Sequence, residues 1–265
     1  MDKLSIAQKE FVAKQVKHKR YVRICQVLIL IGFFSLWEIA SAMGWINSFI
    51  FSSPSRMFTM FVSMAKEGTI AIHVLTTLGE TLVSFLIVLV VGLIISLLLW
   101  LSKGASEIIE PYLVTLNSLP KSALAPVLIV WLGNNIKTVI VAAISLAVFG
   151  SIITLYTGFK EVDEDKIKLI YTLGGKKTDV VKKIIIPSAI PLILSNMKVN
   201  IGLCLVGAII GEFLSANQGL GYLIIYGSQV FKMDLVMMSI VILCILSALL
   251  YFGIAYLEKR LSEKY

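Results

Sequence analysis

Charged residues are scarce in this chain of 265 residues: they make up 15% of the total, whereas hydrophobic residues make up 58%. A soluble domain normally carries about 25% charged residues. The mean hydropathy is +0.91, so the chain has more apolar side chains than the core of one soluble domain can bury. The shortage of charge therefore excludes an ordinary soluble domain and favours a chain that crosses a membrane several times.

Side chains that carry chemistry are also few. There are two histidines, His18 and His73, and the three cysteines all lie in apolar segments. No H-E-x-x-H, G-x-S-x-G or paired-cysteine motif occurs, and the G-x-x-x-x-G-K-[ST] phosphate loop is absent. We therefore expect no catalytic residue, no metal, no cofactor and no ATP hydrolysis by the chain itself. The basic stretches lack aromatic interleaving and zinc-type spacing, which argues against nucleic acid.

Long apolar runs are abundant instead. Three of them, 81–102, 138–159 and 235–257, contain no charged residue and exceed the roughly 20 residues that cross a hydrocarbon layer about 30 Å thick. Each is a predicted transmembrane helix.

Three further runs are interrupted by charge or proline. They are 24–43 with Glu38, 111–131 with Pro120, Lys121 and Pro126, and 191–214 with Lys198 and Glu212. Such interruptions are tolerated where protein or water, rather than lipid, surrounds them. The sequence therefore predicts an all-α membrane protein with six transmembrane helices.

Lysine and arginine are distributed unequally between the connections. One side, made of residues 1–23, Lys103, 160–183 and the C-terminal tail, holds 18 of them, and the other side holds 4. By the positive-inside rule both termini are cytoplasmic. Residues 1–23 are then a cytoplasmic arm, expected as a polar helix on the membrane surface, and 24–265 form the transmembrane domain. The long basic region, with no A-x-A-like site after it, argues against a cleavable signal peptide.

The cytoplasmic connection at 160–190 is dense in charge, with twelve charged residues between positions 160 and 183. Tyr171, Leu173, Val180 and Val181 interrupt them at near-helical spacing, and Gly174-Gly175 breaks the run. The pattern predicts a short amphipathic helix, a sharp turn and a second helix that ends at Pro187. Such a hook can dock into a groove on another protein. From these residues alone, a solvated charged loop is the alternative.

Four motifs, in order along the chain, resemble the permeases of type I ABC importers. Gly174 followed after nine residues by Ile184-Ile185-Ile186-Pro187 resembles their cytoplasmic "EAA" loop, whose form is E-A-A, three residues, Gly, nine residues, I-x-L-P. Three more stretches resemble the subgroup for nitrate, sulfonates, taurine and thiamine-pyrimidine-like or flavin-like compounds: 76–82 its entry to the second span, 119–133 its third span, and 211–213 followed by 219–224 its fifth span and external loop. Together the motifs cover about 73–257, the expected importer core.

The resemblance implies the type I importer permease fold in a bacterial cytoplasmic membrane. It also implies a cytoplasmic ABC ATPase dimer, a second permease subunit (expected to be an identical chain) and an extracytoplasmic binding protein. The residues implied to couple to the ATPase are Lys168, Thr172, Gly174, Gly175, Lys176, Lys177, Asp179 and Pro187. One departure stands out: Lys168-Leu169-Ile170 replaces Glu-Ala-Ala, so the contact must differ in charge, with Glu164 and Asp165 as nearby acids.

Four polar residues inside predicted spans are candidates for a solute path. Lys121 lies ten residues beyond Pro111, about 15 Å along a helix, and either lines the passage or pairs structurally near the inner leaflet. Asn196 and Asn200 flank Lys198, and we expect them to share its face. Glu212 either contacts an outer gate or packs against the glycine-rich external loop.

The predicted function is that of a permease subunit that imports a small polar solute delivered from outside. The resemblance favours an aliphatic sulfonate, nitrate or taurine-like anion, with a thiamine-pyrimidine or riboflavin-like vitamin precursor as the alternative. The candidate path residues include both a base and an acid, so their charge does not distinguish an anionic solute from a vitamin precursor. A gradient-driven carrier or channel, and a non-transporting membrane scaffold, are rivals of a different class.

Overall fold

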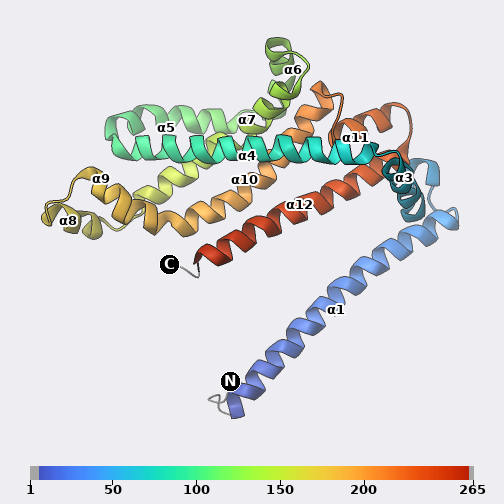
Figure 1. The fold of residues 1–265 in the computed structure, drawn as a ribbon, viewed down its shortest axis with the longest axis horizontal. Helices are drawn as coiled ribbons and strands as arrows, with labels where there is room; N and C mark the ends of the chain where they lie inside the picture. Colours follow the sequence, from blue (N-terminus) through green and yellow to red (C-terminus); the bar gives the residue numbers. More distant parts are fainter. Residues whose placement is uncertain (1–5, 263–265) are drawn as a thin grey trace.

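The computed structural model describes residues 6–262, and its regular structure there is helical throughout. The helices are α1 (Ile6–Ala42), α2 (Ser48–Phe51), α3 (Pro54–Lys66), α4 (Thr69–Leu101), α5 (Lys103–Ser118), α6 (Lys121–Leu132), α7 (Ile136–Lys160), α8 (Glu164–Thr172), α9 (Lys177–Val180), α10 (Ile186–Ser215), α11 (Leu220–Gln229) and α12 (Met233–Ser262), with a π-helical turn at Val181–Ile185. The all-α prediction is confirmed. Figure 1 shows α4, α7 and α10 running side by side along the long axis, with α8 and α9 at one end and α3 and α11 at the other.

Five helices in the described part of the chain are long and apolar enough to cross a membrane, so the predicted count of six is not confirmed. The predicted third span, 111–131, is wrong as one continuous helix. It falls across α5 and α6, which have 16 and 12 residues and are only about 24 Å and 18 Å long. The break lies at Leu119, whose extended backbone (φ −62°, ψ 141°) is the conformation that a following proline imposes.

The described part of the N-terminal arm, from Ile6 on, is helical as expected, but it continues into the first span as one helix. α1 runs unbroken for 37 residues, contains no proline, and is about 56 Å long. Its main contacts are with α2 and α3, and Figure 1 shows it diverging from the rest of the bundle. No break in the helix marks the expected boundary at residue 23.

Small residues let the central helices approach closely. A Cβ at Gly207 of α10 would lie 2.5 Å from the Cα of Ala143 on α7, and one at Gly211 would lie 2.8 Å from the Cα of Val139. On α4, a Cβ at Gly92 would lie 2.8 Å from the Ser151 hydroxyl of α7. Close approach through small residues is a common basis of helix packing in membranes. It makes α4, α7 and α10 the packed core of the chain.

The connections before α3 and between α6 and α7 are shaped by local capping and turn residues. Ser53 caps α3, and Pro54 occupies the first helical position. Glu38 on α1 accepts hydrogen bonds from the Ser55 amide (3.0 Å) and hydroxyl (2.7 Å), so this acid within the first span joins α1 to α3. Between α6 and α7, Gly133 adopts φ +83° and Asn135 caps α7. These residues form the short connection between α6 and α7.

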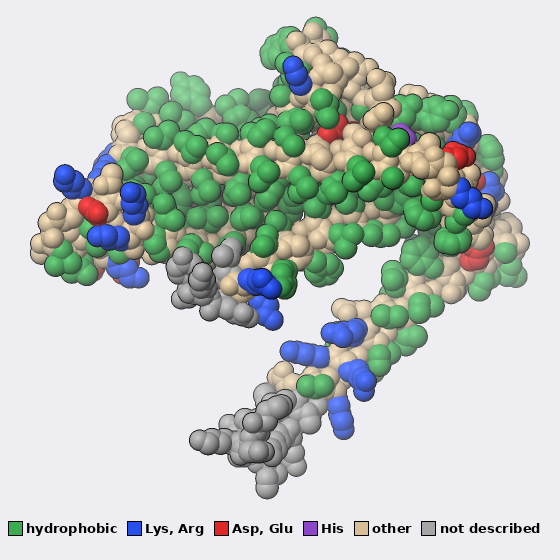
Figure 2. All heavy atoms as spheres, in the orientation of Figure 1, with side chains coloured by type: hydrophobic (Ala, Val, Ile, Leu, Met, Phe, Trp, Pro, Cys, Tyr) green, Lys and Arg blue, Asp and Glu red, His purple; other side chains and the backbone are tan. Residues whose placement is uncertain are grey.

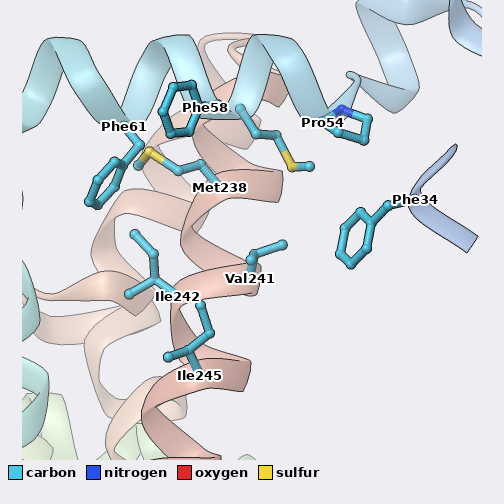
Figure 3. A pocket seen from close by; sticks show the side chains of 9 residues that line it. Phe34, Pro54, Phe58, Phe61, Met238, Val241, Ile242 and Ile245 are labelled. Atoms are coloured by element: carbon cyan, nitrogen blue, oxygen red, sulfur yellow. The ribbon is translucent and has the colours of Figure 1, made fainter. Parts of the chain in front are cut away.

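Hydrophobic and basic side chains occupy different parts of the bundle, as expected for a protein that crosses a membrane. Figure 2 shows hydrophobic side chains over the middle of the bundle, and lysine and arginine gathered at the α8–α9 end and on the N-terminal half of α1. An apolar groove of about 310 Å³ lies where α1, α3 and α12 meet (Figure 3). Phe34 faces it from α1, Phe58 and Phe61 from α3, and Ile242 and Ile245 from α12.

Candidate functional site

The predicted helix–glycine–helix hook is present between α7 and α10. α8 begins after Asp163, whose carboxylate accepts from the Asp165 amide at 2.9 Å, and Glu164 and Asp165 lie in its first turn, where the helix dipole favours acids. Figure 1 places α8 and α9 beyond the ends of the long helices. The connection therefore contains the two predicted helices and the glycine turn between them.

Gly174 and Gly175 close α8. Gly174 has φ +79°, its amide donates to the Tyr171 carbonyl (3.0 Å), and the Gly175 amide donates to the Ile170 carbonyl (2.9 Å). This is the Schellman arrangement, which requires a left-handed residue at the position of Gly174. A Cβ at Gly174 would meet nothing within 4 Å, so its need for glycine is conformational. A Cβ at Gly175, by contrast, would lie 2.9 Å from the Ile170 carbonyl oxygen.

The second half of the hook is tied to the bundle. The Lys176 amide donates to the Asp179 carboxylate at 2.8 Å, and the Lys177 ammonium donates to the Leu101 carbonyl at the end of α4. Val180 and Ile185 are buried in a cluster with Leu155 and Phe159 of α7, which Ile167 and Ile170 of α8 also join. The hook is therefore packed against the ends of α4 and α7 and against the helical stretch that continues into α10.

Pro187 does not end the second helix, which corrects that prediction. Residues 177–215 form a continuous helical stretch of 39 residues, with Pro187 in the first turn of α10. Proline has no amide to donate to the carbonyl four residues earlier, and the π-turn at Val181–Ile185 ends two residues before Pro187. A single helical rod thus joins the hook to the opposite end of the bundle.

Three apolar side chains at the end of the hook are exposed, a feature that the sequence reasoning missed. Leu173 is 74% exposed, Leu169 is 58% exposed, and Tyr171 is also exposed. Leu169 and Leu173 are four residues apart and share one side of α8. Lys168 lies beside them and forms ion pairs of 3.3 Å with Asp165 and 3.7 Å with Glu164, all of them largely exposed. An exposed apolar patch flanked by charge is typical of a protein–protein contact.

Lys121 does not lie partway along one long helix, because the helix breaks immediately before it. Its ammonium donates to the carbonyl (2.9 Å) and the side-chain oxygen (3.1 Å) of Asn117. It therefore caps the C-terminal end of α5, where a cation is favoured. The structural alternative fits this contact, and the expected depth of 15 Å along a single helix was wrong.

Asn196 and Asn200 are brought together, but not with Lys198. Both are buried, and their amides donate to the hydroxyl of Ser151 on α7 at 2.8 and 2.9 Å. Lys198 lies on another side of α10 and pairs with Glu258 of α12 at 2.8 Å. The expected shared face was therefore wrong. Ser151 could not be identified from the sequence, because nothing along the chain links it to α10.

Glu212 contacts the backbone at the start of α11, next to the glycine-rich loop named in one of its two predicted alternatives. It is 1% exposed, and its two carboxylate oxygens accept from the Thr77 hydroxyl (2.6 Å) and the Gly221 amide (2.5 Å). Glu80 of α4, which the sequence reasoning did not single out, lies against the same carboxylate. The groove in Figure 3, by contrast, is lined by hydrophobic side chains and offers a polar solute no hydrogen-bonding side chain.

Comparison with known proteins identifies the family. Residues 89–263, well over half of the chain, match the family described as "Binding-protein-dependent transport system inner membrane component". The chain belongs to this family. Membership makes it a non-catalytic permease subunit of an ABC transporter in the inner membrane. ATP hydrolysis belongs to a separate subunit, and a binding protein is the other general partner.

Named relatives and a solved structure agree with this. The chain is 27% identical over 204 residues to the formylaminopyrimidine transport permease protein ThiX of Halalkalibacterium halodurans, covering 77% of this chain and 81% of that one. It is 22% identical over 247 residues to the taurine transport system permease protein TauC of Escherichia coli, covering 89% and 90%. The fold is similar, with a TM-score of 0.66 at 12% identity, to a chain of a bacterial ABC transporter involved in import of the acidic polysaccharide alginate, covering 94% and 98%.

Proposed function

We propose that the permease is coupled to its ATPase through the end of the α8–Gly174–α9 hook, with Leu169, Tyr171 and Leu173 seated in a groove of the ATPase. The observation that carries this is the exposure of these three apolar side chains on an ordered, charged projection. An apolar helix face in a hydrophobic groove is a common mode of recognition. Lys168, Thr172, Lys176, Lys177 and Asp179 form the polar surroundings of the contact.

The hook can pass a movement on because it is attached rigidly. Val180 and Ile185 are fully buried, and the 39-residue helical rod carries any rotation of the hook along the bundle. Closure of two ATPase subunits on ATP would move two such rods in a permease dimer of identical chains. The four polar candidates for the solute path would then act indirectly, because they hold neighbouring helices together. They are Lys121, Asn196, Asn200 and Glu212.

The charge distribution supports an orientation with both termini and the hook in the cytoplasm. The segments around α3 and α11 then face outward, where a binding protein delivers solute. The solute we favour is a small sulfonate or taurine-like anion, because the relative named for taurine transport is matched over 89% of this chain. A formylaminopyrimidine-like heterocycle is the second candidate, supported by the higher identity of the relative named for it.

The decisive test of coupling is Gly174→Ala in proteoliposomes with the ATPase and the binding protein. Alanine in the left-handed region costs roughly 1–2 kcal/mol, so the turn is expected to shift and solute-stimulated ATP hydrolysis to fall severalfold. Gly104→Ala is the matched control, since Gly104 has no left-handed φ and open space around its Cβ position. Normal stimulation in Gly174→Ala would remove the hook from the mechanism.

The substrate and the rival mechanism need separate measurements. Calorimetry of the cognate binding protein with taurine, a short alkanesulfonate and formylaminopyrimidine decides between the two solute classes. A gradient-driven carrier predicts uptake into vesicles without ATP or any partner. We expect no such uptake.

A further inference from the structure

A second group of polar side chains lies at the opposite end of the rod from the hook. Three successive amides at the start of α11 are each held by a side chain. Gly219 donates to Nδ1 of His73 (3.1 Å), Leu220 to the Thr77 hydroxyl (2.8 Å) and Gly221 to Glu212 (2.5 Å). His73 and Thr77 are four residues apart on one face of α4. We call these contacts the latch, because they fasten α11 to α4 and α10.

Two positions of the latch, 219 and 221, require glycine. Gly219 has φ +115°, and a Cβ there would overlap the Glu212 carboxylate. A Cβ at Gly221 would lie 2.7 Å from Oε2 of Glu212. The two glycines therefore allow the carboxylate to reach the backbone at the N-terminus of α11. An anion there is stabilised by the amides and by the helix dipole.

Glu80, one turn beyond Thr77 on α4, completes the group. It is 3% exposed and lies within hydrogen-bonding reach of Glu212, and its Oε2 has no partner among the described residues. Neither carboxylate takes part in any salt bridge of the described part of the chain. Two ionised carboxylates buried in contact repel each other strongly, and a buried charge without a partner is costly.

Within residues 6–262, the neighbours of the two carboxylates supply no compensating cation. α7 contributes Val139 at this level, against Gly211, and the carbonyl of Ile140, 3.4 Å from the Ser84 hydroxyl. α12 packs on α11 through apolar residues such as Leu235 and Met238. On α11 itself, the ring of Tyr222 stacks on His73 at 6.1 Å. His73 accepts from the Gly219 amide through Nδ1, which requires a lone pair on that nitrogen.

We infer that Glu80 and Glu212 share one proton: Glu80 is a neutral carboxylic acid that donates its O–H to Glu212, and Glu212 stays ionised at the N-terminus of α11. The assignment follows from the donors, because both oxygens of Glu212 already accept hydrogen bonds and Oε2 of Glu80 accepts none. The pair is a buried proton site, and the proton is part of the latch.

The role of this shared proton in transport rests on the proposed function. Glu212 lies on the same helical rod as Lys177 of the hook, so movement at the hook reaches the latch. When the latch opens, water can reach Glu80 and its proton can leave to a water molecule. The closed latch then holds one more proton than the open one. By linkage, closure is favoured as the pH falls and opposed as it rises.

Infrared spectroscopy of the purified permease tests the proton without any partner protein. At neutral pH we expect a carboxylic-acid C=O stretching band, shifted in D₂O, that is lost in Glu80→Gln. Absence of this band, its retention in Glu80→Gln, or its loss on adding sodium ions alone would overturn the proposal. The last result would mean that a metal cation occupies the site.

Hydrogen exchange tests the latch. In Glu80→Gln the amide N–H replaces the acid O–H as donor to Glu212, so we expect the 219–221 amides to keep their protection and to lose its dependence on pH. In Glu212→Gln one of the two acceptors is lost, and we expect protection to fall at least about tenfold, since hydrogen bonds to a charged acceptor are strong. The opposite ranking of the two variants would place the proton on Glu212 and overturn the assignment. Because neither measurement needs the ATPase, failure here is separate from failure of the coupling proposal.

Discussion

The hook and the latch, at the two ends of the helical rod, are stabilised by different kinds of interaction. The hook keeps its shape through backbone features (a left-handed glycine, an acid at each helix start, a capped turn), while its side chains remain largely exposed. The latch keeps its shape through buried side chains of α4 and α10, which hold the backbone amides at the start of α11. Exposed ion pairs typically contribute at most about 1 kcal/mol, whereas a buried charged acceptor contributes several times more. The surface that we propose binds and releases the ATPase is therefore separated from the buried contacts that hold α4, α10 and α11 together.

The largest effect should come from removing the acceptor of the latch. Glu212→Ala leaves the Gly221 amide and the Thr77 hydroxyl without their partner, and we expect a loss of about 3 kcal/mol of stability. Thermal unfolding of the detergent-solubilised permease measures it. Glu107→Ala is the control, because its 4.0 Å pair with Lys103 is exposed and should cost under about 1 kcal/mol. Equal losses in both variants would erase the contrast between buried and exposed charge.

A somewhat smaller effect is expected in the rod that joins the two ends. Gly207→Ala would push a methyl group against the backbone of Ala143 on α7, and overpacking of this kind costs about 1–3 kcal/mol. Gly202→Ala on the same helix meets nothing within 4 Å and should be neutral or slightly stabilising. If the two variants unfolded at the same temperature, the close contact between α7 and α10 would be contradicted.

The smallest effect on stability belongs to the hook. Lys168→Gln removes two exposed ion pairs and should change stability by less than about 0.5 kcal/mol. Its effect on ATPase binding should be larger and should shrink as salt is raised, because exposed charges are screened. Binding of purified ATPase to the permease in nanodiscs, at low and at high salt, measures this. A salt-independent loss would indicate that Lys168 is buried in the contact.

The hook could be predicted because its signals are local. The charges between 160 and 183, the glycine pair and the apolar spacing all lie within one stretch of chain, and they led to helices that the structure contains. The end of the second helix was misplaced because a proline in the first turn of a helix and a proline after a helix look alike in sequence. Only the packing of Ile185 against α7 distinguishes them.

The latch could not be predicted from the sequence because its residues lie far apart along the chain. Thr77 and Glu212 lie 135 positions apart, and Leu220, whose amide donates to Thr77, lies 143 positions from it. One signal was available: Glu80 follows His73 and Thr77 at helical spacing, just before a charge-free run, and an acid in such a place needs a partner. The broken third span was visible in Pro120 and Pro126, but a proline within a span can bend a helix or end it. Tertiary contacts decide between the two.

Disulfide trapping at the end of the hook tests the central claim most directly. In a permease with its three native cysteines replaced, Leu173→Cys should form a cross-link with an engineered cysteine in the groove of a copurified ATPase that carries a phosphate loop. The same residue should be protected from a water-soluble thiol reagent in the assembled complex and reactive in the free permease, where it is 74% exposed. Full reactivity in the complex, with no cross-link at any groove position, would contradict the account.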